Sequence, residues 1–73
     1  MISQYVIYRH PKGYDNKFVV REWFAHDDGK ISANAEVAAV VDTLYEARQY
    51  IPSGMTNLGR DQFDPAVIEE VWT

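Results

Sequence analysis

Residues 17 to 26, KFVVREWFAH, form the strongest β-strand signal in the chain because they are rich in β-branched and aromatic residues. Turn-forming residues bound the segment on both sides, with Asp28-Gly29 after it and the stretch 11 to 16 before it. Side chains alternate across a strand, so one face would carry Phe18, Val20, Glu22 and Phe24 and the other Val19, Arg21, Trp23 and Ala25. Large apolar residues therefore lie on both faces, and a sheet built on this strand needs cover on two sides.

Two further segments predict strands. Residues 3 to 9, SQYVIYR, should pair with residues 17 to 26 as a hairpin, because Pro11, Gly13, Asp15 and Asn16 supply a turn between them. Residues 66 to 73, AVIEEVWT, follow Pro65 and predict a final strand. Strict alternation would place Ile68, Glu70 and Trp72 on one face of that strand and Val67, Glu69 and Val71 on the other.

The stretch from residue 33 to residue 51 admits two interpretations. Alanine and glutamate favour one long helix, since apolar residues recur near helical spacing. The alternative is a strand over 36 to 41 followed by a helix over 44 to 51, because Thr43 and Glu46 have the spacing of a capping box and Asp42 adds negative charge at the helix start. We favour the second interpretation, since a capping box has no role inside a helix.

A helix of this length can cover only one face of a sheet. It ends before Pro52 and offers Leu44, Ala47 and Ile51 on one side. Residues 52 to 65 contain several helix- and strand-breaking residues and predict an irregular loop. We expect Met55, Leu58 and Phe63 to hold that loop against the body.

The element order β-β-β-α-β predicts the fold class α+β, in one domain spanning residues 1 to 73. Short connections and a right-handed crossover favour a four-stranded mixed sheet in the order 3-2-1-4. In this arrangement the last strand pairs with the first in parallel, and the helix packs on one face.

Composition limits the function classes. The 73 residues include no cysteine, which excludes disulfides and thiolate metal sites and favours a cytoplasmic location. The net charge of −4, without a cluster of basic residues, lacks the electrostatic pattern of a nucleic-acid binder, so we expect no nucleic-acid partner. The chain has no stretch of about 20 apolar residues and no signal-peptide pattern, so we expect a soluble protein without a membrane span.

No motif predicts a particular reaction. His10 and His26 would lie at opposite ends of the hairpin, Ser3, Ser32 and Ser53 have no evident histidine base, and Glu22, Glu69 and Glu70 are expected to be solvated or ion-paired. The stretches DNKFVV and DDGKIS lack the spacing of a calcium loop. We therefore expect no catalytic residue, no cofactor and no metal.

The uncovered sheet face predicts a binding function. Exposed apolar patches commonly mark interaction surfaces, so we expect self-association, as a homodimer, or binding to another protein, with Arg21, Trp23 and Trp72 as interaction residues. In a simpler interpretation the loop 52 to 65 folds over that face and completes an ordinary core. A second hypothesis is a small-ligand-binding or accessory enzyme domain, whose site lies between the helix and the loop 52 to 65 and uses Arg60.

Overall fold

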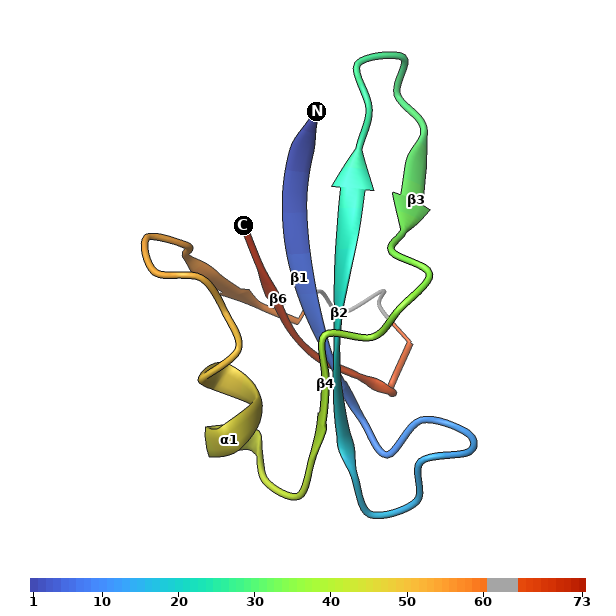
Figure 1. The fold of residues 1–73 in the computed structure, drawn as a ribbon, viewed down its shortest axis with the longest axis vertical. Helices are drawn as coiled ribbons and strands as arrows, with labels where there is room; N and C mark the ends of the chain where they lie inside the picture. The colour runs from blue at the N-terminus through green and yellow to red at the C-terminus, as the bar shows by residue number, and fades with distance from the viewer. Residues whose placement is uncertain (61–64) are drawn as a thin grey trace.

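The computed structural model describes residues 1–60 and 65–73, which form a strongly twisted antiparallel sheet with one short helix (Figure 1). The elements, in chain order, are β1 (Ile2–Arg9), β2 (Phe18–Ala25), β3 (Ile31–Ala33), β4 (Ala39–Val41), α1 (Leu44–Arg48), β5 (Asn57–Gly59) and β6 (Ile68–Trp72). No helix in these described ranges has the length and apolar character that crossing a membrane requires.

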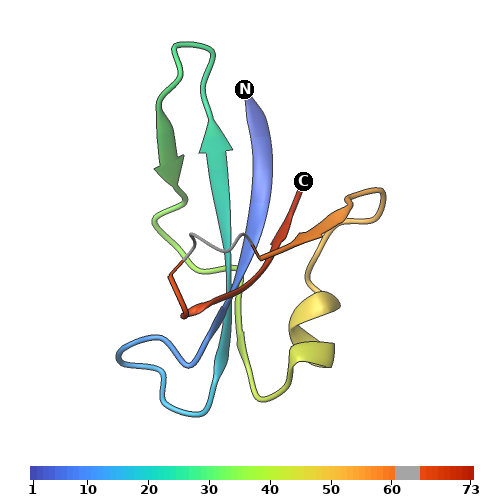
Figure 2. The ribbon, with the colours of Figure 1, turned by 180° about the vertical axis from the view of Figure 1, so that it is seen from behind.

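The sheet is ordered β3-β2-β1-β6-β5, and β4 also pairs with β2. Its longest ladder is the hairpin of β1 and β2, which runs from the pair Ile2–Ala25 to the pair Arg9–Phe18. The predicted hairpin and its two alternating faces are therefore confirmed, and His10 and His26 flank opposite ends of the ladder. In both views β6 runs at a steep angle to this ladder, and β5 lies beyond it on the side of α1 (Figures 1 and 2).

The segment that returns along β2 is split into β3 and β4. Between the pairs Trp23–Ala33 and Val20–Ala39, β2 advances three residues while the return segment advances six. The amides of Asn34 and Ala38 rejoin the ladder at the carbonyls of Glu22 and Val20, at 2.9 and 2.7 Å. The chain thus bulges out of the ladder between Asn34 and Ala38, where asparagine, alanine and glutamate have low β propensity.

The predicted four-stranded mixed sheet in the order 3-2-1-4 is wrong. All strand pairs are antiparallel, and β6 runs antiparallel to β1. The prediction missed β5, which lies within the expected irregular loop and forms an antiparallel pair with β6. Because the chain crosses from β4 through α1 to β5 and only then turns back, the final strand runs opposite to the predicted direction.

The helix begins where the capping box predicts. The Thr43 hydroxyl accepts a hydrogen bond from the Glu46 amide at 3.1 Å, and the same hydroxyl donates to the Glu46 carboxylate at 3.2 Å. The carboxylate therefore reaches the cap's hydroxyl instead of its backbone amide. Residues 39 to 41 are extended, so the long helix is excluded, but α1 is shorter than predicted and ends at Arg48.

The core lies between α1 and the sheet. Ile7, Val20 and Ala47 are completely buried there and Phe18 is nearly so, with Leu44, Ile51 and Trp72 among the partly buried residues packed around them. Met55 is half-buried, whereas Leu58 is 60% exposed and does not hold its segment against the body. Phe63, the third residue expected in this role, lies outside the described residues.

An irregularity in the pairing of β6 changes its faces. The register with β1 shifts between Ile7–Glu70 and Tyr8–Ile68, so β6 carries one extra residue there. Ile68 and Val71 consequently line the same pocket, while Glu70 and Trp72 lie on the helix side. Strict alternation had placed Ile68 with Glu70 and Trp72, and the bulge is the reason that this prediction fails.

Candidate functional site

The sheet face opposite α1 carries an open groove, and we call this side the groove face. Its larger pocket has a volume of about 630 Å³ and is lined from five strands. Val6 forms part of the pocket wall and is itself 7% exposed. The other lining residues come from β1, β2, β3, β5, β6 and the residue after β5: Gln4, Tyr8, Trp23, Ile31, Leu58, Gly59, Arg60, Ile68 and Val71.

Trp23 and Tyr8 form the polar contact within this groove. The indole Nε1 of Trp23 donates a hydrogen bond to the Tyr8 hydroxyl at 2.9 Å. Both side chains are half-buried, and the bond links the two residues diagonally across the β1–β2 hairpin, in which Tyr8 pairs with Val19 and Trp23 with Gln4. A paired indole N–H leaves an apolar ring surface turned toward the groove, which suits contact with apolar groups.

A smaller pocket of about 260 Å³ continues the same face toward the turn between β1 and β2. Tyr8 lines both pockets, so the two are neighbours. The smaller pocket brings together Lys12 and Arg21 with the side chains of Tyr14, Val19 and Val37. It thus adds two cations at one end of an apolar groove.

Three aliphatic side chains at the margin of the groove face are largely exposed. Ile2 and Ile31 are 62% and 68% exposed, and Leu58 is 60% exposed. Ile2 and Ile31 both pair with Ala25, so Ile2, Ala25 and Ile31 form one cross-strand row and share one face. Apolar surface therefore extends from the groove along the β1–β2–β3 ladder.

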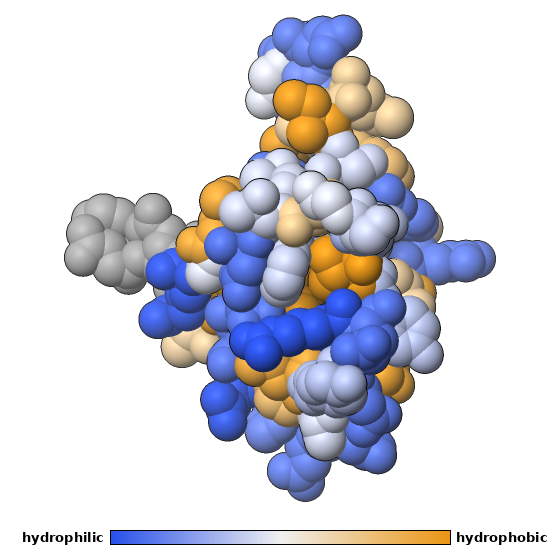
Figure 3. Space-filling model, turned by 90° about the vertical axis from the view of Figure 1, so that its left-hand side faces the viewer, coloured by the Kyte–Doolittle hydropathy of each residue, from blue (hydrophilic) through white to orange (hydrophobic). Residues whose placement is uncertain are grey.

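The helix side of the sheet has a different character, with a band of hydrophilic side chains crossing apolar surface (Figure 3). Its main feature is Glu70, whose buried carboxylate accepts hydrogen bonds from Arg48 Nε at 3.0 Å and also from Arg48 Nη2. Asn57 Nδ2 and Trp72 Nε1 each donate to it at 3.1 Å. The hydrogen bonds from Arg48 are the main reason that the pKa of Glu70 is lowered, and they outweigh burial, which acts to raise it.

The predicted interaction residues do not share a face. Arg21 and Trp23 lie on the groove face, whereas Trp72 packs against the core on the helix side and donates its indole N–H to Glu70. Arg60 lines the larger pocket, which is formed without any residue of α1. The expected position of a ligand site, between the helix and the loop 52 to 65, therefore differs from the position of this pocket.

One polar pair that the sequence did not suggest lies near the β2–β3 hairpin. His26 Nε2 and Ser32 Oγ are 2.8 Å apart, although Ser32 was expected to have no histidine nearby. In the described part of the chain no carboxylate pairs with this histidine, and Ser32 is exposed. A nucleophilic site needs a third group that orients the histidine base, and it is enclosed. The described residues around this pair provide neither, so it serves as a cross-strand contact. Residues 1–60 and 65–73 also contain no group of three side chains suited to a metal ion.

Tyr5 and Glu22 form a cross-strand pair on the helix side. Burial, the negative charge of Glu22 and a hydrogen bond to its carboxylate raise the pKa of Tyr5. Asn34 Nδ2 approaches the same carboxylate at 3.5 Å. This cluster, like that of Glu70, joins separate strands and stabilises the sheet.

Comparisons with protein-family models, with curated proteins and with solved structures found no match to this chain. The geometry of the groove face is therefore the basis for the functional proposal below.

Proposed function

We propose that this chain is a protein-interaction domain without catalytic activity of its own, and that it binds its partner through the groove face. The observation that carries the proposal is the coincidence of an apolar groove with exposed Ile2, Ile31 and Leu58 on one sheet face. Contiguous exposed apolar surface commonly marks an interaction site. The absence of cysteine supports a cytoplasmic setting for this interaction.

The energetics support a protein partner. Burying a fully exposed large aliphatic side chain contributes roughly 1.5–3 kcal/mol. Because Ile2, Ile31 and Leu58 are already partly covered, burying each of them under a partner would contribute about 1–2 kcal/mol to the free energy of binding. Trp23, half-buried and with its N–H already paired, adds an aromatic surface at the centre, where interface hot spots are usually found. These features together suit a partner segment that lies along the groove.

The cysteine-free chain permits a direct test. Leu58→Cys places a single thiol at the groove, and Tyr45→Cys places one on α1, where Tyr45 is 73% exposed. Each variant is labelled with a benzophenone maleimide and irradiated in an extract of the cells in which the protein occurs. We expect a specific adduct from position 58 and none from position 45. Equal labelling from both positions, or no adduct from position 58, would contradict the proposal, and an adduct of twice the chain mass would identify a second copy as the partner.

A small-ligand function is the second candidate. The volume of the larger pocket falls in the range of small-molecule sites, and Arg60 lines it. In this alternative Arg60→Ala lowers the affinity for a carboxylate-bearing ligand, whereas Lys30→Ala, at the β2–β3 hairpin, leaves it unchanged. A thermal-shift screen of small carboxylates against the two variants tests this prediction, and the same shift in both would exclude it.

A further inference from the structure

The pockets of the groove face are lined by positive charge, although the net charge of the chain is negative. The chain has eleven acidic and seven basic residues, yet the described residues that line the two pockets include Lys12, Arg21 and Arg60 and no acidic residue. Three other cations of the described residues, outside the two pockets, have acidic partners. Arg9 pairs with Glu69, Lys17 with Asp42, and Arg48 with Glu70.

Arg21 and Lys12 are placed to bind anions beside an apolar surface. Arg21 is half-buried on β2 between Val19 and Trp23 of the same face, and neither it nor Lys12 has an ion pair with a described residue. A guanidinium that is partly removed from water and flanked by apolar side chains interacts more strongly with a carboxylate than a fully solvated one does. The groove face therefore combines apolar pockets with positive charge, within a protein whose net charge is negative.

We propose that the groove face binds an acidic segment of another protein that also carries large apolar side chains. In this complex, apolar side chains fill the larger pocket around Trp23, and carboxylates meet Lys12 and Arg21 in the smaller one. The inference rests on the proposed function and adds the chemistry of the partner to it. Complementary charge sets specificity and speeds association, while the apolar contacts supply most of the affinity.

A second copy fits this face less well. A two-fold symmetric pair brings the same patch of both copies together, and because no described lining residue is acidic, Lys12 and Arg21 of each copy would find no carboxylate among those residues of the other. Single-stranded nucleic acid is also disfavoured. A strand of phosphates needs a track of cations, whereas aliphatic residues make up half of the described lining of the larger pocket, which has one cation, Arg60.

The test selects peptides on the intact chain. A random library of twelve-residue peptides displayed on phage is panned against the immobilised 73-residue protein, and the recovered sequences are compared with the unselected library. We expect enrichment of peptides that combine aspartate or glutamate with large aliphatic or aromatic residues. Enriched peptides without an excess of acidic residues, or the absence of any enriched peptide, would overturn the inference.

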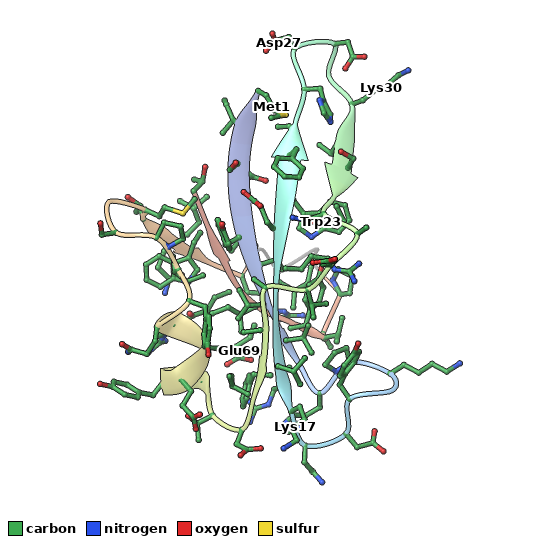
Figure 4. The ribbon with its side chains drawn as sticks, viewed as in Figure 1. Met1, Lys17, Trp23, Asp27, Lys30 and Glu69 are labelled. Atoms are coloured by element: carbon green, nitrogen blue, oxygen red, sulfur yellow. The ribbon has the colours of Figure 1, made fainter. Side chains whose placement is uncertain are left out.

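A matched pair of charge reversals then locates the binding of the most enriched peptide. Lys12→Glu changes a pocket residue, and Lys30→Glu makes the same change at the β2–β3 hairpin, where Lys30 points away from the body (Figure 4). The two variants have the same net charge. We expect Lys12→Glu to weaken binding by roughly fivefold or more relative to Lys30→Glu, as the loss of one exposed ion pair and its replacement by repulsion would do. Equal affinities for the two variants would contradict the inference.

Two further measurements separate this inference from the proposed function. Leu58→Ser removes an exposed groove residue, and Tyr45→Ser removes an exposed residue of α1. If the enriched peptides are neutral but bind the Leu58→Ser variant more weakly than the wild type, the inference of an acidic partner is wrong and the groove face remains the binding face. If acidic peptides bind Leu58→Ser and Tyr45→Ser equally, the groove face itself is wrong. Binding of a deoxythymidine oligonucleotide that is lost with Lys12→Glu, and is tighter than that of any peptide, would overturn the inference in favour of nucleic acid.

Discussion

Arg48 and Glu70 bring the end of the helix and the last strand together through two hydrogen bonds, although 22 residues separate them in the chain. The Glu70 side chain is 8% exposed, whereas that of Arg48 is 44% exposed. A carboxylate in such a place is tolerated because Arg48, Asn57 and Trp72 all donate to it. The cluster therefore joins α1, β5 and β6 into one unit.

We expect Glu70→Gln to lower the free energy of unfolding by roughly 1.5–3 kcal/mol, the contribution of a hydrogen bond to a charged group. Urea denaturation followed by tryptophan fluorescence measures the change. Glu69→Gln is the matched control, because Glu69 is more exposed and its ion pair with Arg9 is longer, at 3.6 Å. A larger loss for Glu69→Gln than for Glu70→Gln would show that the cluster does not hold these elements together.

The same carboxylate predicts a loss of stability in acid. The pKa of Glu70 is lower in the folded protein than its ordinary value of 4.5, so its contribution to stability is fully present above that value. The contribution declines as the pH falls below 4.5 and through the folded pKa. We expect the difference in unfolding free energy between wild type and Glu70→Gln to shrink in this window, as urea titrations at pH 7 and at pH 3 would measure. A constant difference would contradict the prediction.

Tyr5 predicts a loss of stability at high pH, in contrast to the loss in acid predicted for Glu70. Its pKa is raised above the ordinary value of 10.0, so the folded state holds the phenol proton more firmly than the unfolded state does. The stabilisation is present below pH 10 and is lost as the pH rises through the folded pKa. A spectroscopic titration of the phenol absorbance, in wild type and in Tyr5→Phe, should show one tyrosine that ionises late in wild type only.

The helix cap makes a separate contribution. Thr43→Ala removes the acceptor of the Glu46 amide, and we expect a loss of about 1 kcal/mol, as for other caps of this kind. In a domain of this size that loss lowers the melting temperature by roughly 4–8 °C. Thr43→Ser keeps the hydroxyl and should retain most of the stability. If both variants melt at the wild-type temperature, the cap has no energetic role.

The contact between Trp23 and Tyr8 can be tested without disturbing the groove's shape. Tyr8→Phe removes the acceptor of the indole N–H, so we expect a loss of about 0.5–1.5 kcal/mol in the free energy of unfolding. Tyr14→Phe is the control, since the hydroxyl of Tyr14 has no hydrogen-bond partner among the described residues. Equal effects of the two substitutions in urea denaturation would exclude a structural role for the contact.

The parts of the fold that could be predicted are those encoded by local patterns. The β1–β2 hairpin follows from dense β-branched and aromatic residues around a clear turn, and the start of α1 follows from Thr43 and Glu46. β5 could not be recognised, because Asn57, Leu58 and Gly59 have little β propensity. That strand depends on tertiary contacts, including the Asn57 bond to Glu70 and the backbone pair between Thr56 and Thr73.

The candidate site was predictable in part for the same reason. Alternation along β2 placed Arg21 and Trp23 together, and the structure keeps both on the groove face. Trp72 was assigned to the same function, but its face depends on the direction of β6 and on the bulge opposite Tyr8, neither of which has a local sequence signal. Lys12 and Arg21 are nine positions apart in the chain and share a pocket because of the turn between β1 and β2. This proximity also has no local sequence signal.

The position of β6 between β1 and β5 has a consequence for synthesis on the ribosome. The meander of β1 to β4 can form as soon as it leaves the exit tunnel, but the edge of β1 stays open until residues 68 to 72 have also emerged. A nascent chain stalled before that point would present unpaired backbone groups to its neighbours. Chaperone capture or misassembly on polysomes would therefore concentrate in that interval of translation.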